Sequence, residues 1–489
     1  MKPIIARRDE ALTGNAQRTS SVRGALASLS LSTLLSTLGI SIANVGLPTL
    51  AQAFTASFQD VQWIVLAYLL AITTLIVGVG RLGDITGRRR LLLAGIFLFT
   101  AASVLCGVAP TLWMLTAARA VQGLGAAIMM ALTMAMVGET VSKARTGSAM
   151  GLLGTMSAIG TALGPSLGGV LIAGLGWRAI FLVNVPLGVL AFLLAHRTLP
   201  VDRQETNTGP KTDRAGFDHV GTLLLALTLA AYALAMTIGR GSFGPLNMAL
   251  LLAAVFGVGL FVLAETRAAS PLIQLAMFRD PVLSASLAMS ALVSTVVMAT
   301  LVVGPFYLSR AFGLDAALVG LVLSVGPIAA ALTGVPAGRI ADRFGAQRMT
   351  IVGLIGMAAG SFTLSMMPVA FGLPGYIAPL VVIAVSYALF QTANNTAVMT
   401  DIRPDQRGVI SGVLNLSRNL GLITGASVMG AVFALASATI DITTAPPEAV
   451  AAGMRITFAV AGVLIVGALA IATGSRVLAT RALLPGDAP

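Results

Sequence analysis

The sequence predicts an all-α integral membrane protein of fourteen transmembrane helices: two six-helix pseudo-repeats with two extra helices between them. Three observations carry this prediction: a charge-poor composition, regularly spaced hydrophobic runs and an internal repeat. Of the 489 residues, 57% are hydrophobic and 10% are charged, whereas a soluble protein carries about 25% charged residues. Because so few polar side chains remain to cover a water-facing surface, the chain must use lipid as its solvent.

The hydrophobic runs are each long enough to cross a bilayer as a helix, which takes roughly 20 apolar residues. The first run follows Arg18 and Arg23 and is about twice the length of the apolar part of a signal peptide, so it is predicted to be an uncleaved span. The fourteen predicted spans are residues 24–47, 61–79, 91–108, 112–137, 148–173, 179–195, 219–238, 246–264, 282–308, 317–337, 349–367, 376–399, 409–434 and 456–475.

The basic residues predict that both ends of the chain are cytoplasmic. With the N-terminus inside, the inner segments hold 24 of the 30 Lys and Arg residues, the outer segments hold four, and two lie within spans. Cytoplasmic loops of membrane proteins are rich in Lys and Arg, so this split favours an even number of spans. It also accounts for the net charge of +12 without a nucleic-acid-binding groove.

The chain repeats itself at two closely similar offsets. Residues 80–87 return as residues 338–345 at an offset of 258, and five glycines from Gly147 to Gly169 return from Gly408 to Gly430 at an offset of 261. Internal repeats of this kind are typical of secondary transporters, whose substrate site lies between the repeats. The predicted parts are a cytoplasmic tail (1–23), a six-helix bundle (24–195), a linker (196–218), two inserted helices (219–264), a linker (265–281), a second six-helix bundle (282–475) and a cytoplasmic tail (476–489).

Four segments occur in the order of a known set of motifs. They are residues 80–90 between spans two and three, residues 119–125 in span four, Gly160 with residues 164–169 in span five, and residues 177–186. Over nearly the whole chain the sequence resembles the major facilitator superfamily, specifically its fourteen-span drug:proton antiporter branch. The resemblance implies alternating-access efflux of small amphipathic molecules or drugs, driven by the proton-motive force. It also implies a monomer, without a cofactor, in the cytoplasmic membrane of a bacterium.

Two acidic residues predict a latch between the halves on the cytoplasmic side. Asp84 and Asp342 each lie one repeat away from a helix that begins at a glycine, Gly408 and Gly147 respectively. Because a helix N-terminus attracts carboxylates, these contacts would favour an outward-open state, and the resemblance implies this gating role for residues 80–90. The predicted gating residues are Gly80, Asp84, Gly87, Arg88, Asp342, Arg343, Gly345 and Asp401, with Arg88 expected to pair with Glu139 and Arg348 with Asp401.

Polar side chains at helical spacing predict the lining of a central cavity. The candidates are Thr37, Ser41 and Asn44 in span one, Gln391, Asn394 and Asn395 in span twelve, and Asn415 and Arg418 in span thirteen. Ser and Thr in membrane helices often serve packing alone, so the role of span one stays open. An arginine within the membrane normally faces the protein interior. For Arg119, grouped with Gln122 and Glu139, the resemblance implies a part in proton transfer or in stabilising the cavity.

Glycines at mostly four-residue spacing predict that span five packs closely against other helices. The residues are Gly160, Gly164, Gly168 and Gly169, and Pro165 among them removes one backbone hydrogen bond and is expected to bend the span.

Acidic residues are missing from the predicted membrane interior. All 18 Asp and Glu residues lie in loops, tails or span edges, and Gly39 stands where the resemblance implies an aspartate in span one. With two buried arginines and no interior carboxylate, the chain is expected to prefer neutral or anionic molecules over dications. Proton coupling would then involve edge acids such as Glu139 or Asp315, or a titratable group of the substrate.

Other function classes receive less support. The Gly-x-Ser-x-Gly pattern at 164–168 lies in an apolar helix rather than a strand-to-helix turn, and His196 and His219 lie at one inner loop, so an enzyme is not expected. No phosphate-binding loop or metal site is predicted. The alternative is a uniporter or importer of anionic or neutral metabolites, with Arg119 and Arg418 as anion contacts. A non-transporting sensor comes third. The expected partners are a small-molecule substrate, protons and the lipid bilayer.

Overall fold

The computed structural model describes residues 3–56, 58–200, 218–237, 244–268, 270–314, 316–400, 402–403, 406–437 and 446–483. Throughout these ranges the regular structure is helical, which confirms the predicted all-α class. Thirteen helices are long and apolar enough to span a membrane, and a fourteenth span bends by 41° between Lys143–Gly164 and Ser166–Leu175. This count agrees with the fourteen predicted spans.

The first part of the chain supplies the helices of the N-terminal half. They are α1 (Pro3–Ala53), α2 (Phe58–Thr86), α3 (Arg88–Val108), α4 (Leu112–Thr140), the 3-10 turn η1 (Lys143–Arg145), α5 (Thr146–Leu175), α6 (Ala179–Leu182) and α7 (Asn184–Thr198). The sixth predicted span is one apolar helix, Ala179–Thr198, labelled α6 and α7 on either side of Val183, whose backbone stays helical. Pro186, two residues into α7, has no N–H to donate to the preceding turn, so one helical hydrogen bond is missing there.

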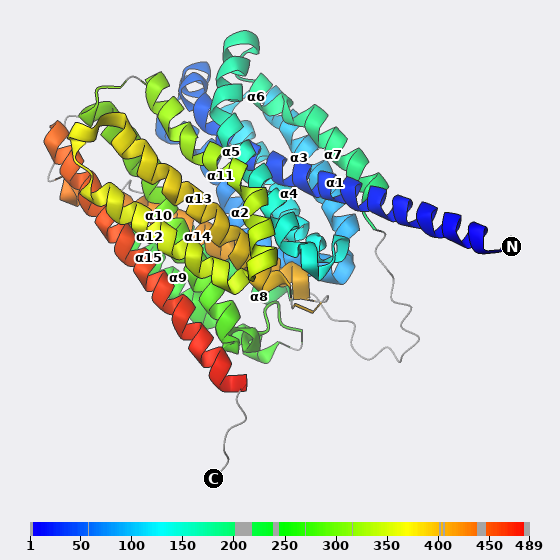
Figure 1. Ribbon diagram of the computed structural model, residues 1–489. Coiled ribbons are helices and arrows are strands. Elements are labelled where there is room, and N and C mark those ends of the chain that lie inside the picture. Colours follow the sequence, from blue (N-terminus) through cyan, green and yellow to red (C-terminus); the bar gives the residue numbers. More distant parts are fainter. Residues whose placement is uncertain are drawn as a thin grey trace.

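The rest of the chain forms the inserted pair and the C-terminal half. The helices are α8 (His219–Thr237), α9 (Pro245–Arg267), η2 (Leu275–Arg279), α10 (Pro281–Ala311), α11 (Ala316–Phe344), α12 (Ala346–Met366), η3 (Val369–Phe371), α13 (Gly372–Met399), α14 (Arg407–Ala436) and α15 (Pro447–Leu483). The long helices run side by side as one bundle (Figure 1).

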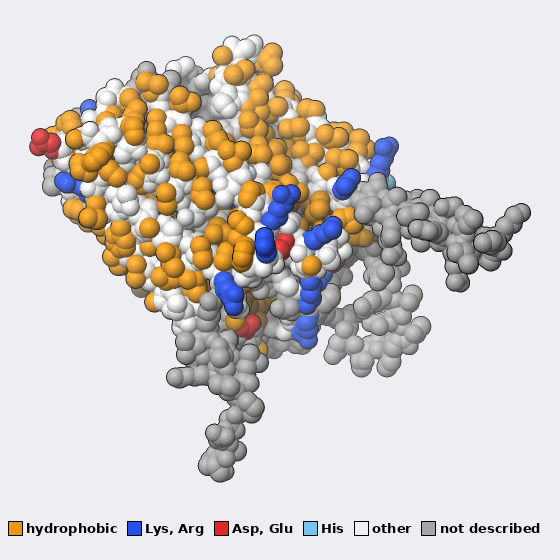
Figure 2. Space-filling view, in the orientation of Figure 1, with side chains coloured by type: hydrophobic (Ala, Val, Ile, Leu, Met, Phe, Trp, Pro, Cys, Tyr) orange, Lys and Arg blue, Asp and Glu red, His pale blue; other side chains and the backbone are white. Residues whose placement is uncertain are grey.

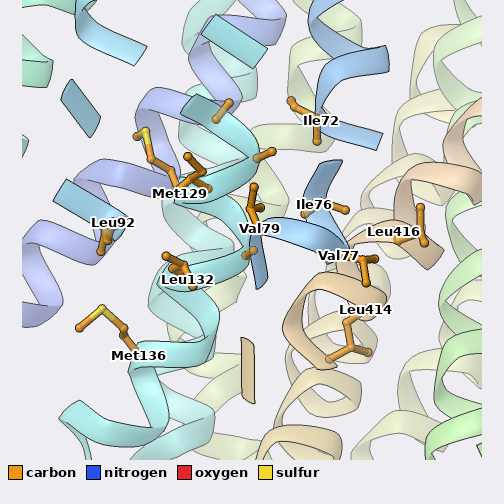
Figure 3. Packing of buried hydrophobic residues seen from close by; sticks show 14 of the residues in the cluster. Ile72, Ile76, Val77, Val79, Leu92, Met129, Leu132, Met136, Leu414 and Leu416 are labelled. Carbon is orange, nitrogen blue, oxygen red and sulfur yellow. The ribbon is translucent and has the colours of Figure 1, made fainter. Parts of the chain in front are cut away.

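Each half has its own hydrophobic packing, and one cluster continues across the interface. A cluster of buried side chains between Ala285 and Ala472 belongs to the C-terminal half alone. A second cluster combines α2, α3 and α4 with the start of α14. In Figure 3, Val77 of α2 lies beside Leu414 and Leu416 of α14. The two halves are therefore held together by apolar packing as well as by the polar contacts described below.

The inserted pair α8–α9 adds three side chains, Leu225, Leu229 and Phe261, to this second cluster. Helix α8 packs on α9, α2 and α14, whereas α9 exposes apolar side chains such as Leu252, Val255 and Phe256. Hydrophobic side chains cover most of the surface in Figure 2, and Lys and Arg gather toward one end. An apolar flank with charges at its end is the surface that a bilayer-spanning protein presents.

Candidate functional site: a cavity between the halves and its cytoplasmic gate

A cavity of about 280 Å³ lies between the two halves. Its wall comes from α1, α4 and α5 on one side and from α10, α11, α13 and α14 on the other. The polar residues that line it are Thr33, Thr37, Thr133, Ser157, Thr161, Thr300, Tyr387, Gln391, Thr392, Asn395, Asn415 and Arg418. A site shared by both halves changes shape when the halves move relative to each other.

Arg418 is the charged residue among those that line the cavity, and no Asp or Glu is among them. Tyr387 lies close enough to Arg418 for an electrostatic interaction. The two ion pairs found in the described part of the chain do not involve Arg418. A bound molecule with a negative or hydrogen-bond-accepting group would therefore meet a guanidinium that no carboxylate neutralises.

Five predicted residues line this cavity: Thr37, Gln391, Asn395, Asn415 and Arg418. Three others lie elsewhere. The Ser41 hydroxyl donates to Gly160 O at 2.8 Å, Asn44 is exposed outside the cavity, and the buried Asn394 donates to Ser286 O at 3.3 Å. The spacing that predicts a polar face does not reveal which neighbouring helix covers it.

The apolar part of the wall was not predicted. Met130, Met134, Met150 and Leu153 line the cavity beside the polar residues. Methionine side chains adapt to ligands of different shape, which suits an amphipathic ligand. In the sequence these apolar residues cannot be distinguished from lipid-facing ones. The one signal for an apolar cavity wall was the presence of three methionines, Met130, Met134 and Met150, in the inner halves of α4 and α5.

Arg119 does not line the cavity but lies within the N-terminal half, where its side chain is fully buried. Its Nε donates to Ile64 O at 2.9 Å, and one terminal nitrogen donates to Gln122 Oε1 at 2.5 Å. The guanidinium stacks over the Tyr68 ring, with its Cζ 4.1 Å from the ring centroid. Gln122 in turn donates to Ser103 Oγ at 2.7 Å.

This pocket also contains the position of the missing acid. A Cβ added at Gly39 would lie 3.2 Å from the Tyr68 hydroxyl and 3.2 Å from Phe99 Cζ. An acid at position 39 would therefore lie near Arg119 rather than in the cavity. In this chain Tyr68 and two carbonyl-type oxygens take the place of a carboxylate around Arg119.

Asp84 joins α2 to the N-terminus of α14. Its carboxylate accepts hydrogen bonds from Gly408 N at 2.9 Å and Val409 N at 3.0 Å. Arg88 donates to the same carboxylate through Nε at 3.0 Å and through a terminal nitrogen at 2.6 Å, and its other terminal nitrogen pairs with Glu139. The side chain of Asp84 is 1% exposed, so these contacts are shielded from water.

Asp342 makes the repeat-related contact from α11 to the N-terminus of α5. It accepts from Gly147 N at 2.8 Å, from Ser148 N at 2.9 Å and from the Ser148 hydroxyl at 2.6 Å. We call these two carboxylate contacts, of Asp84 and of Asp342, the inner gate. Both are made at the end of the bundle that the basic residues predict to be cytoplasmic.

The other predicted gating residues occupy different places. Gly87 and Gly345 have φ of 104° and 91°, which favours glycine at these turns. Arg343 is exposed and stacks over Phe344, so it does not contact the inner gate. Asp401 lies outside the described residues.

Glycines allow the backbones to meet at the inner gate. A Cβ added at Gly80 would lie less than 3.0 Å from Gly408 O, and one at Gly338 would lie equally close to Gly147 O. One turn further, Gly151 of α5 approaches Gly334 of α11 in the same way. Of the glycines at these crossings, only Gly80 was among the predicted gating residues, although the five-glycine repeat contained the signal for Gly147, Gly151 and Gly408.

The glycines of the fifth span have two different surroundings. Gly160 packs against Thr37 and Leu34 of α1, and Gly164 packs against Ser41 of α1. By contrast, no atom lies within 4 Å of the position that a Cβ of Gly169 would take. Gly168 is buried, and the bend of 41° in α5 falls between Gly164 and Ser166, at Pro165. The described packing therefore belongs to the first two glycines.

Two helical halves that enclose a polar cavity and close it at one end define a multi-span membrane transporter. The chain belongs to the Major Facilitator Superfamily, which matches residues 29–426.

Individual relatives agree with this assignment. The chain is 31% identical to the multidrug resistance protein Stp of Mycobacterium tuberculosis over 412 residues, which are 82% of this chain and 74% of Stp. It is 29% identical over 403 residues to the riboflavin transporter RibZ of Clostridioides difficile, covering 82% of this chain and 86% of RibZ. The crystal structure of the human organic anion transporter MFSD10 (TETRAN) has the same fold. The superposition has a TM-score of 0.63 at 16% sequence identity and covers 92% of this chain and 99% of MFSD10.

Proposed function

We propose that the protein exports small amphipathic molecules across a bacterial cytoplasmic membrane, driven by the proton-motive force, with both termini inside. The closed inner gate, together with a cavity shared by the two halves, supports alternating access. The relatives Stp and RibZ are named for multidrug resistance and for riboflavin transport, and both fit a cavity walled by methionine, leucine and amide side chains.

The charge of the cavity is the observation that carries the choice of substrate. Arg418 lines it and no acidic residue does. In a site of low dielectric, two unit charges 4 Å apart interact by ~4 kcal/mol even at an effective dielectric constant near 20. A cation would be repelled and an anion attracted by this amount. We therefore place neutral and monoanionic amphipathic molecules ahead of dications.

Transport into proteoliposomes tests this proposal. Two fluorescent molecules with the same aromatic scaffold, one carrying a sulfonate and one a quaternary ammonium group, are offered with and without an imposed pH gradient. The gradient should drive movement of the anion, with the cation moving more slowly. Movement of the anion down its own concentration gradient, at a rate independent of the pH gradient, would instead identify a uniporter. Absence of movement with either molecule would contradict the proposal.

Arg418→Gln should lower the rate for the anion about 10-fold or more, because a hydrogen bond to a charged group contributes about 1.5–3 kcal/mol. The rate for the cation should rise or stay constant. Arg310→Gln provides the matched control, because Arg310 is an exposed arginine at the outer end of α10 that does not line the cavity. Equal effects of the two substitutions would contradict a role for cavity charge.

A further inference from the structure

Two carboxyl groups, each with a buried oxygen, face each other at the end of the inserted helices that is predicted to be cytoplasmic. Asp218 immediately precedes α8, and its Oδ1 accepts from Gly221 N at 2.7 Å. Glu265 lies near the end of α9, is 4% exposed and accepts from Ile273 N through Oε2 at 3.3 Å. Each carboxyl group thus uses one oxygen to hold the backbone of the described chain.

The second oxygens, Asp218 Oδ2 and Glu265 Oε1, are buried and have no hydrogen-bond partner among the described residues. A Cβ added at Gly221 would lie within 2.5 Å of both, so the two oxygens are no more than 5 Å apart. Two ionised carboxylates this close in a buried place repel each other and lack solvation. A proton held by one carboxyl group removes the second charge and gives the unpaired oxygens a donor.

We propose that Asp218 and Glu265 bind one proton between them, and that this proton site controls the inner gate. Because the two unpaired oxygens lie so close together, the proton belongs to the pair rather than to either residue. The site is separate from the transport cavity. Its effect on the inner gate would be the same whatever the substrate and the direction of transport.

The surrounding charges set the direction of the effect. Arg81 of α2 interacts electrostatically with Glu265 but forms no ion pair with it in the described part of the chain. His219 of α8 and Arg267 of α9 are exposed. On the side of α14 the first charged residue is Arg407, and residues 270–275 of the connecting loop contain no titratable side chain. Arg81, on the neighbouring helix α2, is therefore the cation that a doubly ionised pair would attract.

The pair is connected to both partners of the Asp84 contact. On one side, Arg81 precedes Asp84 by three residues in α2. On the other side, Glu265 holds Ile273, and the next residue, Gln274, accepts from Gln406 Nε2 at 3.0 Å. Gln406 lies two residues before Gly408, whose N–H binds Asp84. Loss of the proton should draw Arg81 toward α8–α9 and stabilise the closed gate, whereas protonation should favour opening.

Infrared spectroscopy tests the proton site without any transport measurement. The C=O band of a protonated carboxyl group should be present near neutral pH in the reconstituted protein. It should be lost in Glu265→Gln and in Asp218→Asn, both of which retain an oxygen that can hold the backbone. Asp280→Asn is the matched control, since Asp280 caps α10 through Val282 N at 2.8 Å without a facing carboxylate. A band that persists in both variants would overturn the proposal.

Pulsed electron-spin distance measurements test the link to the gate. Labels replace the exposed residues Ile85 and Gln347, one on each half, in a variant without Cys106. Raising the pH from neutral until the proton is lost should shorten the distance in the wild type and in Asp280→Asn. In Glu265→Gln the distance between the two labels should be long and independent of pH. A pH response in Glu265→Gln equal to that of the wild type would overturn control of the gate by this pair, whatever the protein transports.

Discussion

Arg119 illustrates how a charge is accommodated at the scale of one residue. Its guanidinium is fully buried, donates to a backbone oxygen and an amide oxygen, and stacks on the face of Tyr68, while its second terminal nitrogen has no hydrogen-bond partner among the described residues. These partners need a flat group with several donors in a fixed fork, and lysine offers a compact ammonium instead. The site therefore distinguishes arginine from lysine although both are positive.

Arg119→Lys should lower the free energy of unfolding by about 1–3 kcal/mol, because a buried acceptor on Ile64 or Gln122 loses its donor. Thermal unfolding in detergent measures the change. The control is Arg178→Lys, since Arg178 also stacks on an aromatic ring, with its Cζ 4.4 Å from the centroid of Trp177, but is exposed. Its effect should stay within about 0.5 kcal/mol. Equal stability of both variants would contradict this account.

The candidate cavity was predictable in part. Gln391, Asn395 and Arg418 are polar groups that are costly to place in lipid, so their types alone indicated an interior surface. Ser41 and Asn394 share the same periodicity, but their oxygen or amide is used by a neighbouring helix. That distinction depends on which helix lies opposite, and a single sequence does not contain it.

At the scale of helices, two glycine crossings bring the halves together. Helices α2 and α14 meet at Gly80 and Gly408, and α5 and α11 meet at Gly147 and Gly338. The crossings are repeat-related, because Gly80 corresponds to Gly338 and Gly147 to Gly408. Small residues let helix backbones approach in a membrane, so each crossing positions a helix N-terminus for Asp84 or Asp342.

Gly151→Ala should open the inner gate, because the added methyl group would lie less than 3.0 Å from Gly334 O. Overpacking costs about 1–3 kcal/mol, which corresponds to about a 5–150-fold shift of the equilibrium between the closed and the open inner gate. Spin-label distances across the cytoplasmic ends should lengthen and transport should slow. Gly169→Ala, in the same helix, meets no atom within 4 Å and should match the wild type. A Gly151→Ala distance distribution equal to that of Gly169→Ala would exclude a steric role for Gly151.

Asp84→Asn should also shift the protein toward the inward-open state, by removing a charge from a helix N-terminus. Because Asp84 is nearly buried, the effect should approach the upper value of ~2 kcal/mol for such contacts. The same distance measurement reports it, with Glu448→Gln, an exposed charge change near the start of α15, as the control. Unchanged distances and wild-type transport in Asp84→Asn would contradict a gating role for Asp84.

At the scale of the whole molecule, the repeat and the hydrophobic runs were sufficient to predict the fold. They predicted fourteen spans and an insertion, and the inserted helix α8 packs on α2 and α14. The apolar surface in Figure 2 follows from the same composition. The Asp218–Glu265 pair was missed, since its residues are 47 positions apart and in different elements.

The arrangement of the chain across the membrane gives the last prediction. With 24 of the 30 Lys and Arg residues in segments of one side, the positive-inside rule orients both termini toward the cytoplasm. In a Cys106-free variant, a cysteine at Gly209 should react with an impermeant maleimide only from inside. A cysteine at Glu448, next to the start of α15, should react only from outside. Labelling of both positions from one side would require an odd number of spans between α7 and α15 to be lost or gained. The swapped pattern, with position 209 labelled only from outside and position 448 only from inside, would place the closed gate in the other compartment, and the proposed direction of transport would have to be reversed.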